Sequence, residues 1–137
     1  MLPKLLGLAE RSWAPAPDWA NITDAKKAAS SYQYAWSEFV NVIAKKELPR
    51  LDYYSGGFRY RIPTPGLMLD EGKVQANVQF PGFEIRYTTD GTEPGKNSKL
   101  YVEPIPDLKN LSFKVFNATG RGGKTIKFLS TEKEGLK

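Results

Sequence analysis

The stretch PGFEIRYTTDGTEP, residues 81–94, decides the fold of this chain. It begins with an alternation in which Phe83, Ile85 and Tyr87 face one way and the polar residues between them face the other. A period of two residues predicts a strand with one buried face. The pair Asp90-Gly91 then predicts a tight turn, because glycine tolerates a positive φ and an aspartate can accept from the backbone just after it. No nucleophile, base or metal cluster lies in this stretch, so it indicates a structural β-domain.

The rest of the chain beyond residue 57 is also rich in expected strands. Besides 84–88, the patterns predict strands at 58–62, 73–80, 99–102, 111–116 and 125–129. Turn signals separate them by about 8–12 residues, which is typical of a small β-sandwich. The glycine-rich stretch 117–123 superficially resembles a phosphate-binding loop. A strand rather than a helix is expected after it, so it is predicted to be a hairpin connection.

The first 52 residues favour helices. Residues 2–13 form an apolar helical pattern with few polar positions, which normally requires a large partner surface. Residues 25–44 repeat apolar side chains at helical spacing, with Thr23 or Asp24 as the N-cap. Pro49 is expected to end this second helix, because proline lacks the N–H that a helix interior needs.

Composition excludes most independent catalysis. The 137 residues include neither cysteine nor histidine, which rules out disulfides, thiolate zinc sites and a Ser-His-Asp triad. We therefore expect no metal, no cofactor and no enzymatic activity from this chain alone. The formal charge is +5, but lysines dispersed among acidic residues supply most of it, so nucleic-acid binding is not expected. There is no run long enough to span a bilayer and no signal-peptide pattern at the N-terminus.

Several carboxylates stand close together in the sequence. Asp70 and Glu71 precede Gly72, and Asp90 and Glu93 share one turn. A glycosidase needs two carboxyl groups facing each other across a sugar cleft. Residues that share a turn are expected to face solvent instead, so their predicted roles are structural.

Four segments in order resemble the bacterial chitobiases, the β-N-acetylhexosaminidases of glycoside hydrolase family 20. Residues 81–94 are similar to that family's C-terminal immunoglobulin-like domain, and RYRIPTPG at 59–66 resembles the start of that domain. LLGLAERSW at 5–13 resembles the end of the catalytic barrel, and ELPRLD at 47–52 resembles the segment that leaves its last helix. The family's catalytic Asp-Glu pair lies upstream, so no catalytic residue is carried over. Lys4 departs from the arginine expected at its position.

The resemblance implies an α+β chain. A helical segment over 1–52, the remnant of the barrel, would precede an antiparallel immunoglobulin-like β-sandwich over 58–130 and a flexible tail over 131–137. It also implies an accessory, structural role in an enzyme that releases terminal N-acetylglucosamine from chitin oligosaccharides. The implied partner is the upstream barrel, with self-association through the exposed helix face in its absence. The implied location is periplasmic or extracellular.

Aromatic residues are the candidates for contact with sugar. Trp13 and Trp19 flank the first break between helices, and Tyr53 and Tyr54 lie at the expected hinge with Phe58 and Tyr60 nearby. They would either stack on sugar rings or fill the joints between elements. The competing functional interpretation is therefore an autonomous carbohydrate-binding or adhesion module, and a weaker one is a basic protein-interaction domain.

Overall fold

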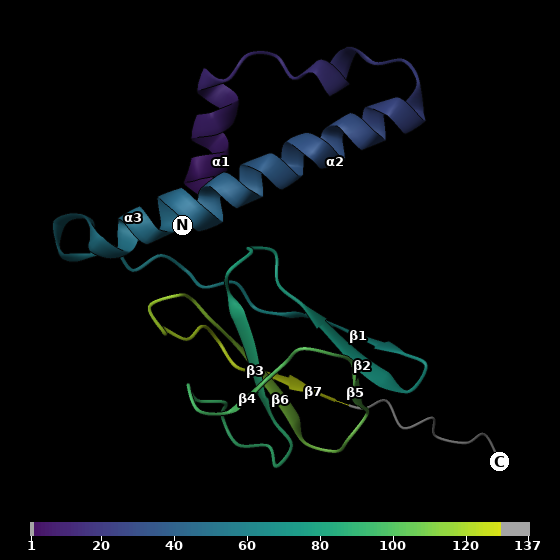
Figure 1. Ribbon diagram of the computed structural model, residues 1–137, viewed down its shortest axis with the longest axis vertical. Coiled ribbons are helices and arrows are strands. Elements are labelled where there is room, and N and C mark those ends of the chain that lie inside the picture. Colours follow the sequence, from purple (N-terminus) through teal and green to yellow (C-terminus); the bar gives the residue numbers. More distant parts are fainter. Residues whose placement is uncertain (1, 130–137) are drawn as a thin grey trace. The chain divides into compact units, whose positions relative to one another are not determined.

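The structure is a computed structural model that describes residues 2–129 (Figure 1). It divides into two compact units. The first holds the residues up to Arg61 together with Phe80–Gly82, and the second holds Ile62–Gln79 and the residues from Phe83 onward. Helices make up the first unit and two antiparallel sheets the second, which confirms the predicted α+β class with a β-sandwich. The tail predicted to be flexible, 131–137, lies outside the described residues.

The first unit is built from three α-helices and short irregular helical turns. Its elements are α1 (Leu2–Trp13), a 3-10 turn (Asp18–Asn21), α2 (Ala25–Val42), a π-helical turn (Ile43–Glu47), α3 (Leu48–Tyr53) and a second 3-10 turn (Tyr54–Gly56). Helix α1 lies close to α2 at Gly7. A Cβ atom added to this glycine would lie 3.7 Å from the ring of Phe39, which is an ordinary van der Waals contact. Asp24 caps α2 as predicted, accepting from the backbone N–H groups of Lys26 at 2.9 Å and Lys27 at 3.1 Å.

Pro49 does not end the helix, and that prediction was wrong. The chain stays helical through Pro49 to Tyr53, because the π-helical turn immediately before it widens the backbone. In this turn the N–H of Leu48 donates to the carbonyl of Ile43, five residues back. A wider turn gives the proline ring more room, and the N–H that proline lacks is no loss at the start of a new helical segment.

Residues 58–62 are not a strand, contrary to prediction. The helical region ends at Gly57, whose φ is +92° and where an added Cβ would lie 2.7 Å from the carbonyl oxygen of Asp52. Only glycine fits there. The N–H of Phe58 donates back to Leu51 at 2.7 Å, and the N–H of Tyr60 donates to Phe58 at 3.0 Å. These local bonds satisfy backbone groups that a strand would have offered to a neighbour.

The second unit contains seven strands in two antiparallel sheets. They are β1 (Gly66–Asp70), β2 (Lys73–Asn77), β3 (Glu84–Thr88), β4 (Lys99–Leu100), β5 (Ile105–Pro106), β6 (Leu111–Phe116) and β7 (Ile126–Phe128). The order is β1-β2-β5 in one sheet and β4-β3-β6-β7 in the other. Strands β3 and β6 have the predicted bounds, whereas β2, β4 and β7 are shorter than expected.

Two strands were not predicted. Strand β1 is mostly exposed and carries three consecutive apolar residues, so it shows no period of two. It exists because Glu71 and Gly72 both adopt positive φ, which closes a two-residue hairpin onto β2. Strand β5 has only two residues, one of them Pro106, and joins β2 through Ile105 opposite Val74. Neither strand has a pattern long enough to detect in sequence.

The sandwich core is centred on β6. Leu111, Phe113 and Val115 alternate along this strand and are fully buried, and Val74 of the other sheet is equally buried. Tyr101 links the two sheets, because its ring meets Phe113 edge-on and its hydroxyl accepts from the N–H of Ala76 at 2.9 Å. Tyr101 is half-buried, so its ring contributes apolar area to the core while its hydroxyl has a hydrogen-bond partner.

The loop 117–123 is a hairpin connection between β6 and β7, as predicted. Asn117 forms hydrogen bonds across the loop. Its side-chain oxygen accepts from the N–H of Arg121 at 2.8 Å and from the hydroxyl of Thr119 at 2.9 Å. The N–H of Gly120, at φ +76°, donates to the Asn117 carbonyl at 2.8 Å. Because these bonds hold the loop closed on itself, its glycines serve the turn rather than a phosphate.

Replacing Asp24 with alanine should destabilise α2 by about 1 kcal/mol, because two backbone N–H groups lose their acceptor. Far-UV circular dichroism during urea unfolding would measure the loss. Thr23→Ala is the matched control, since Thr23 is exposed just outside the cap. Equal unfolding midpoints for Asp24→Ala and the control would contradict the capping role.

Candidate functional site

The four predicted aromatic residues all lie in the first unit, but not together. Trp13 ends α1 and is 89% exposed. Trp19 lies in the first 3-10 turn, half-buried, and meets Tyr32 edge-on with ring centroids 5.4 Å apart. Figure 1 shows this turn near the start of α2, at the opposite end of that helix from α3. Trp19 therefore lies far along α2 from Tyr53 and Tyr54, which follow at the end of α3.

Tyr53 and Tyr54 do share a surface. They are 77% and 68% exposed at the end of α3, and with Pro49 and Arg50 they line a shallow hollow of about 410 Å³. The ring of Tyr54 lies nearly parallel to that of Phe58, at 16° with centroids 6.2 Å apart. We call Arg50, Tyr53, Tyr54 and Phe58 the aromatic platform. Exposed, nearly parallel rings offer flat apolar faces with polar edges.

An ion pair joins Arg50 of the aromatic platform to Glu47. The guanidinium of Arg50 donates to the carboxylate of Glu47 at 3.2 Å, one helical turn away. Tyr60, which the sequence placed near the hinge with the other rings, is buried and donates its hydroxyl to Asp52 at 3.0 Å. The surface thus combines apolar ring faces with exposed donors and acceptors. The buried Tyr60 lies beneath α3 in the sense that its hydroxyl bonds to Asp52 of that helix.

Apolar side chains remain exposed on the helices. Helix α1 exposes Leu5 and Leu8, and α2 exposes Tyr32, Tyr34, Trp36 and Val42. Trp36 packs partly against Phe39 with ring centroids 5.9 Å apart, yet it remains 39% exposed. Several large apolar side chains exposed along two helices favour an interaction surface there.

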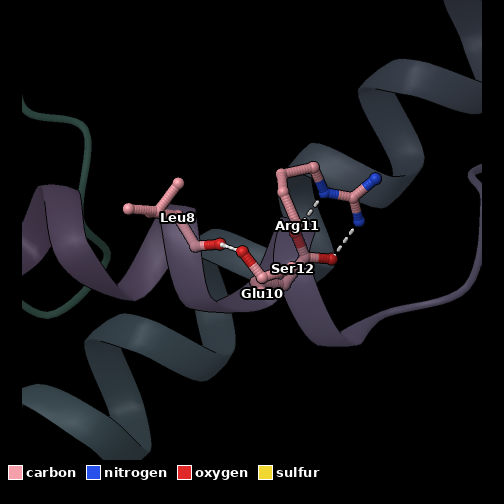
Figure 2. Close-up of polar contacts among 4 residues, drawn as sticks. All are labelled: Leu8, Glu10, Arg11 and Ser12. Carbon is pink, nitrogen blue, oxygen red and sulfur yellow. Dashed lines mark hydrogen bonds and ion pairs between the residues drawn. The ribbon is translucent and has the colours of Figure 1, made fainter.

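The polar side chains at the end of α1 bond to other residues of the same helix. Figure 2 shows the hydroxyl of Ser12 donating to the carbonyl of Leu8, at 2.9 Å, and Arg11 paired with Glu10. The hydrogen bond to Arg11 holds the pKa of the Glu10 carboxyl below its ordinary value. This ion pair joins adjacent residues that are exposed to solvent, so it contributes little to stability and forms no chemical site.

The acidic residues take structural positions. Asp70 and Glu71 are exposed in the β1–β2 turn, where Asp70 accepts from Gln75 at 2.8 Å. The Asp90 carboxylate accepts from both the hydroxyl and the N–H of Thr92, which lowers its pKa. Within residues 2–129, no cluster of three potential metal ligands occurs.

The family can be assigned from sequence similarity. Residues 47–125, more than half of the chain, match the model for the chitobiase/beta-hexosaminidase C-terminal domain. The chain belongs to this family. N,N'-diacetylchitobiase from Vibrio harveyi is 35% identical over 104 residues, and beta-hexosaminidase from Vibrio vulnificus is 26% identical over 147 residues.

The chain covers little of these relatives. The first alignment spans 66% of this chain but 11% of the chitobiase, and the second spans 95% of this chain but 17% of the beta-hexosaminidase. The resemblance predicted from sequence is therefore confirmed for a C-terminal domain. In the part of the chain that the structure describes, no helix has the length and apolar character needed to cross a membrane.

Acid should weaken the sandwich partly through Glu93. Its carboxylate pairs with Lys114, and that hydrogen bond holds the pKa of Glu93 below its ordinary 4.5. A carboxyl whose folded-state pKa is lowered contributes stability that is fully present above pH 4.5 and is lost as pH falls below it. In Glu93→Gln, the urea midpoint should fall less between pH 7 and pH 3 than in the wild type.

The exposed Glu71→Gln in the β1–β2 turn is the control, and it should keep the wild-type pH dependence. Asp90, whose pKa is also lowered, leaves Glu93→Gln some residual acid sensitivity. Identical acid curves for Glu93→Gln and the wild type would exclude a contribution from the ion pair.

Proposed function

We propose that this chain is the C-terminal accessory region of a chitobiase-type β-N-acetylhexosaminidase, and that it packs on the upstream part of that enzyme without catalysing the reaction. The enzyme's substrate would be chitin oligosaccharides bearing terminal N-acetylglucosamine. The family match and the small share of each relative that the chain spans support this role. A periplasmic or extracellular location belongs to the same proposal.

The exposed apolar face of α1 and α2 carries the proposal. Burying a large apolar side chain contributes about 1.5–3 kcal/mol, so several such residues together provide a strong drive to associate. Trp36 and Tyr32 lie one helical turn apart and are both exposed, which places them on one side of α2. The upstream barrel is the proposed partner for this face. A second copy of the chain would cover it when the barrel is missing.

The second candidate function is carbohydrate binding at the aromatic platform. The near-parallel rings of Tyr54 and Phe58 and the adjacent Tyr53 favour it, because pyranose rings present apolar C–H faces that stack on flat aromatic surfaces. The Glu47–Arg50 pair would supply hydrogen bonds to hydroxyl or acetamide groups at the edge. The hollow is shallow, so a sugar would lie on this surface rather than inside it.

The packing role predicts complementation. Chitobiase from Vibrio harveyi, truncated to remove the region that this chain matches, should bind the chain and regain activity on p-nitrophenyl N-acetyl-β-glucosaminide. Trp36→Asp should abolish binding, because it would bury a charge in the interface. Val102→Asp, at an exposed site in the second unit, should bind normally. Nitrophenol release by the chain alone, or equal binding by both variants, would refute the proposal.

The platform hypothesis predicts saturable binding of chitotriose. In an NMR titration, amide resonances at the end of α3 should shift, and Tyr53→Ala combined with Tyr54→Ala should weaken binding at least tenfold, since each stacked ring contributes on the order of 1 kcal/mol. Tyr34→Ala is the control, because Tyr34 is equally exposed on α2 but stands outside the platform. Unchanged spectra at millimolar sugar would rule this function out.

A further inference from the structure

Strand β1 (Gly66–Asp70) lies at an exposed edge of its sheet. It pairs only with β2 in the order β1-β2-β5, so its other side has no neighbouring strand among the described residues. Two of its apolar side chains, Met68 and Leu69, are 56% and 40% exposed. An edge strand presents a row of backbone N–H and C=O groups with which another strand can pair. This edge is therefore both apolar and available for pairing.

The hairpin geometry determines which backbone groups of β1 point outward. The turn residues Glu71 and Gly72 join the pair Asp70 and Lys73, whose backbone groups bond to each other across the turn. Successive residues of an antiparallel strand direct their backbone groups to opposite sides. The groups of Leu67 and Leu69 therefore point away from β2, toward the open edge.

A hydrogen bond on the far side of β2 supports this orientation. Ala76 lies opposite Leu67, and its N–H donates to the Tyr101 hydroxyl at 2.9 Å. Because that bond points away from β1, Leu67 and Ala76 form a pair without hydrogen bonds between them. Within residues 2–129, no backbone group bonds to Leu67 or Leu69 from outside the β1–β2 hairpin.

The other edge strands are protected against pairing, and β1 is not. Strands β4 and β5 have two residues each, and β7 has three. Lysine is present in β4 (Lys99) and β7 (Lys127), and β5 contains Pro106. Short length, lysine and proline are the usual means of blocking an edge. Strand β1 has five residues, GLMLD, with neither lysine nor proline.

The sequence of β1 is complementary to itself in an antiparallel register centred on Met68. Leu67 then lies opposite Leu69 of the second copy, and these two residues exchange the backbone bonds that point outward. Asp70 lies opposite Gly66, so no like charges face each other. The two Asp70 carboxylates are four residues apart along the ladder, about 14 Å, which is beyond the Debye length of about 8 Å. A parallel pairing in register would place them side by side, where like charges repel.

We propose that β1 pairs edge to edge with β1 of a second copy of this chain, antiparallel and with Met68 on the two-fold axis. The pairing joins two three-stranded sheets into one and closes as a symmetric dimer. The two Met68 side chains add an apolar contact at the centre, where facing residues approach most closely. This contact uses neither α1 and α2 nor the aromatic platform, so it is separate from the functions proposed above.

Amide hydrogen exchange, followed by NMR from micromolar to millimolar protein, tests the pairing directly. The amides of Leu67 and Leu69 should exchange about tenfold more slowly when about nine-tenths of the chain is paired, because each N–H gains an acceptor. The amide of Met68, which already bonds to β2, should change little. Association through the helices alone would leave the two leucine amides exchanging at the same rate, and that result would overturn the proposal.

A single introduced thiol tests the register, because the chain has no cysteine. Met68→Cys places two sulfurs across the axis, where facing Cα atoms are about 4.5 Å apart and a disulfide can form. Asp70→Cys, exposed on the same strand, is the control, since its two copies are about 14 Å apart. With Trp36→Asp also present in both to weaken contact between helices, Met68→Cys should cross-link at least tenfold faster. Equal rates would contradict the register.

Sedimentation equilibrium measures the strength of the dimer. Met68→Lys places two ammonium groups directly opposite each other, so the dissociation constant should rise about tenfold. Val102→Lys adds the same charge at an exposed site outside the strands and should leave it unchanged. A wild-type chain that stays monomeric at millimolar concentration, or equal dissociation constants for the two variants, would refute pairing between copies.

Discussion

The burial of β6 is the constraint on which the rest of the sandwich depends. This strand pairs with β3 on one side and β7 on the other, and Leu111, Phe113 and Val115 are all withdrawn from solvent. Because its backbone groups have no access to water, both neighbouring strands must be in register for β6 to be satisfied. The link from Tyr101 to Ala76 then ties the second sheet to the same core. The short strands β4, β5 and β7 need little intrinsic preference, since β6 and its partners position them.

Much of this arrangement could be predicted from alternation and turn chemistry. Strands β3 and β6, the Asp90-Gly91 turn and the Asp24 cap follow from local rules, and the structure has each of them. Failures occurred where a distant or unusual backbone bond overrode a local preference. The π-helical turn before Pro49 provides backbone hydrogen bonds that the residue types do not reveal. Strand β1 has no alternation because it is an edge strand that is exposed along most of its length.

The candidate sites were predictable only in part. The sequence identified the two tyrosines at the expected hinge as candidates. Only the structure shows that they are exposed and that the rings of Tyr54 and Phe58 are nearly parallel. Arg50 drew attention only as part of a family resemblance, because a helix-terminal arginine is ordinary.

The π-helical turn at Ile43–Glu47 also controls direction. Each residue of an α-helix advances the chain by about 100° around the axis, so one extra residue in a turn rotates everything beyond it by that amount. Arg50 and Tyr53 both follow the turn, whereas Tyr32 and Trp36 precede it. The π-helical turn therefore sets the angle about the helix axis between the apolar face of α2 and the aromatic platform, although α2, the turn and α3 are continuous. Gain or loss of a single residue in this turn would rotate the aromatic platform about the helix axis and leave the apolar face of α2 where it is.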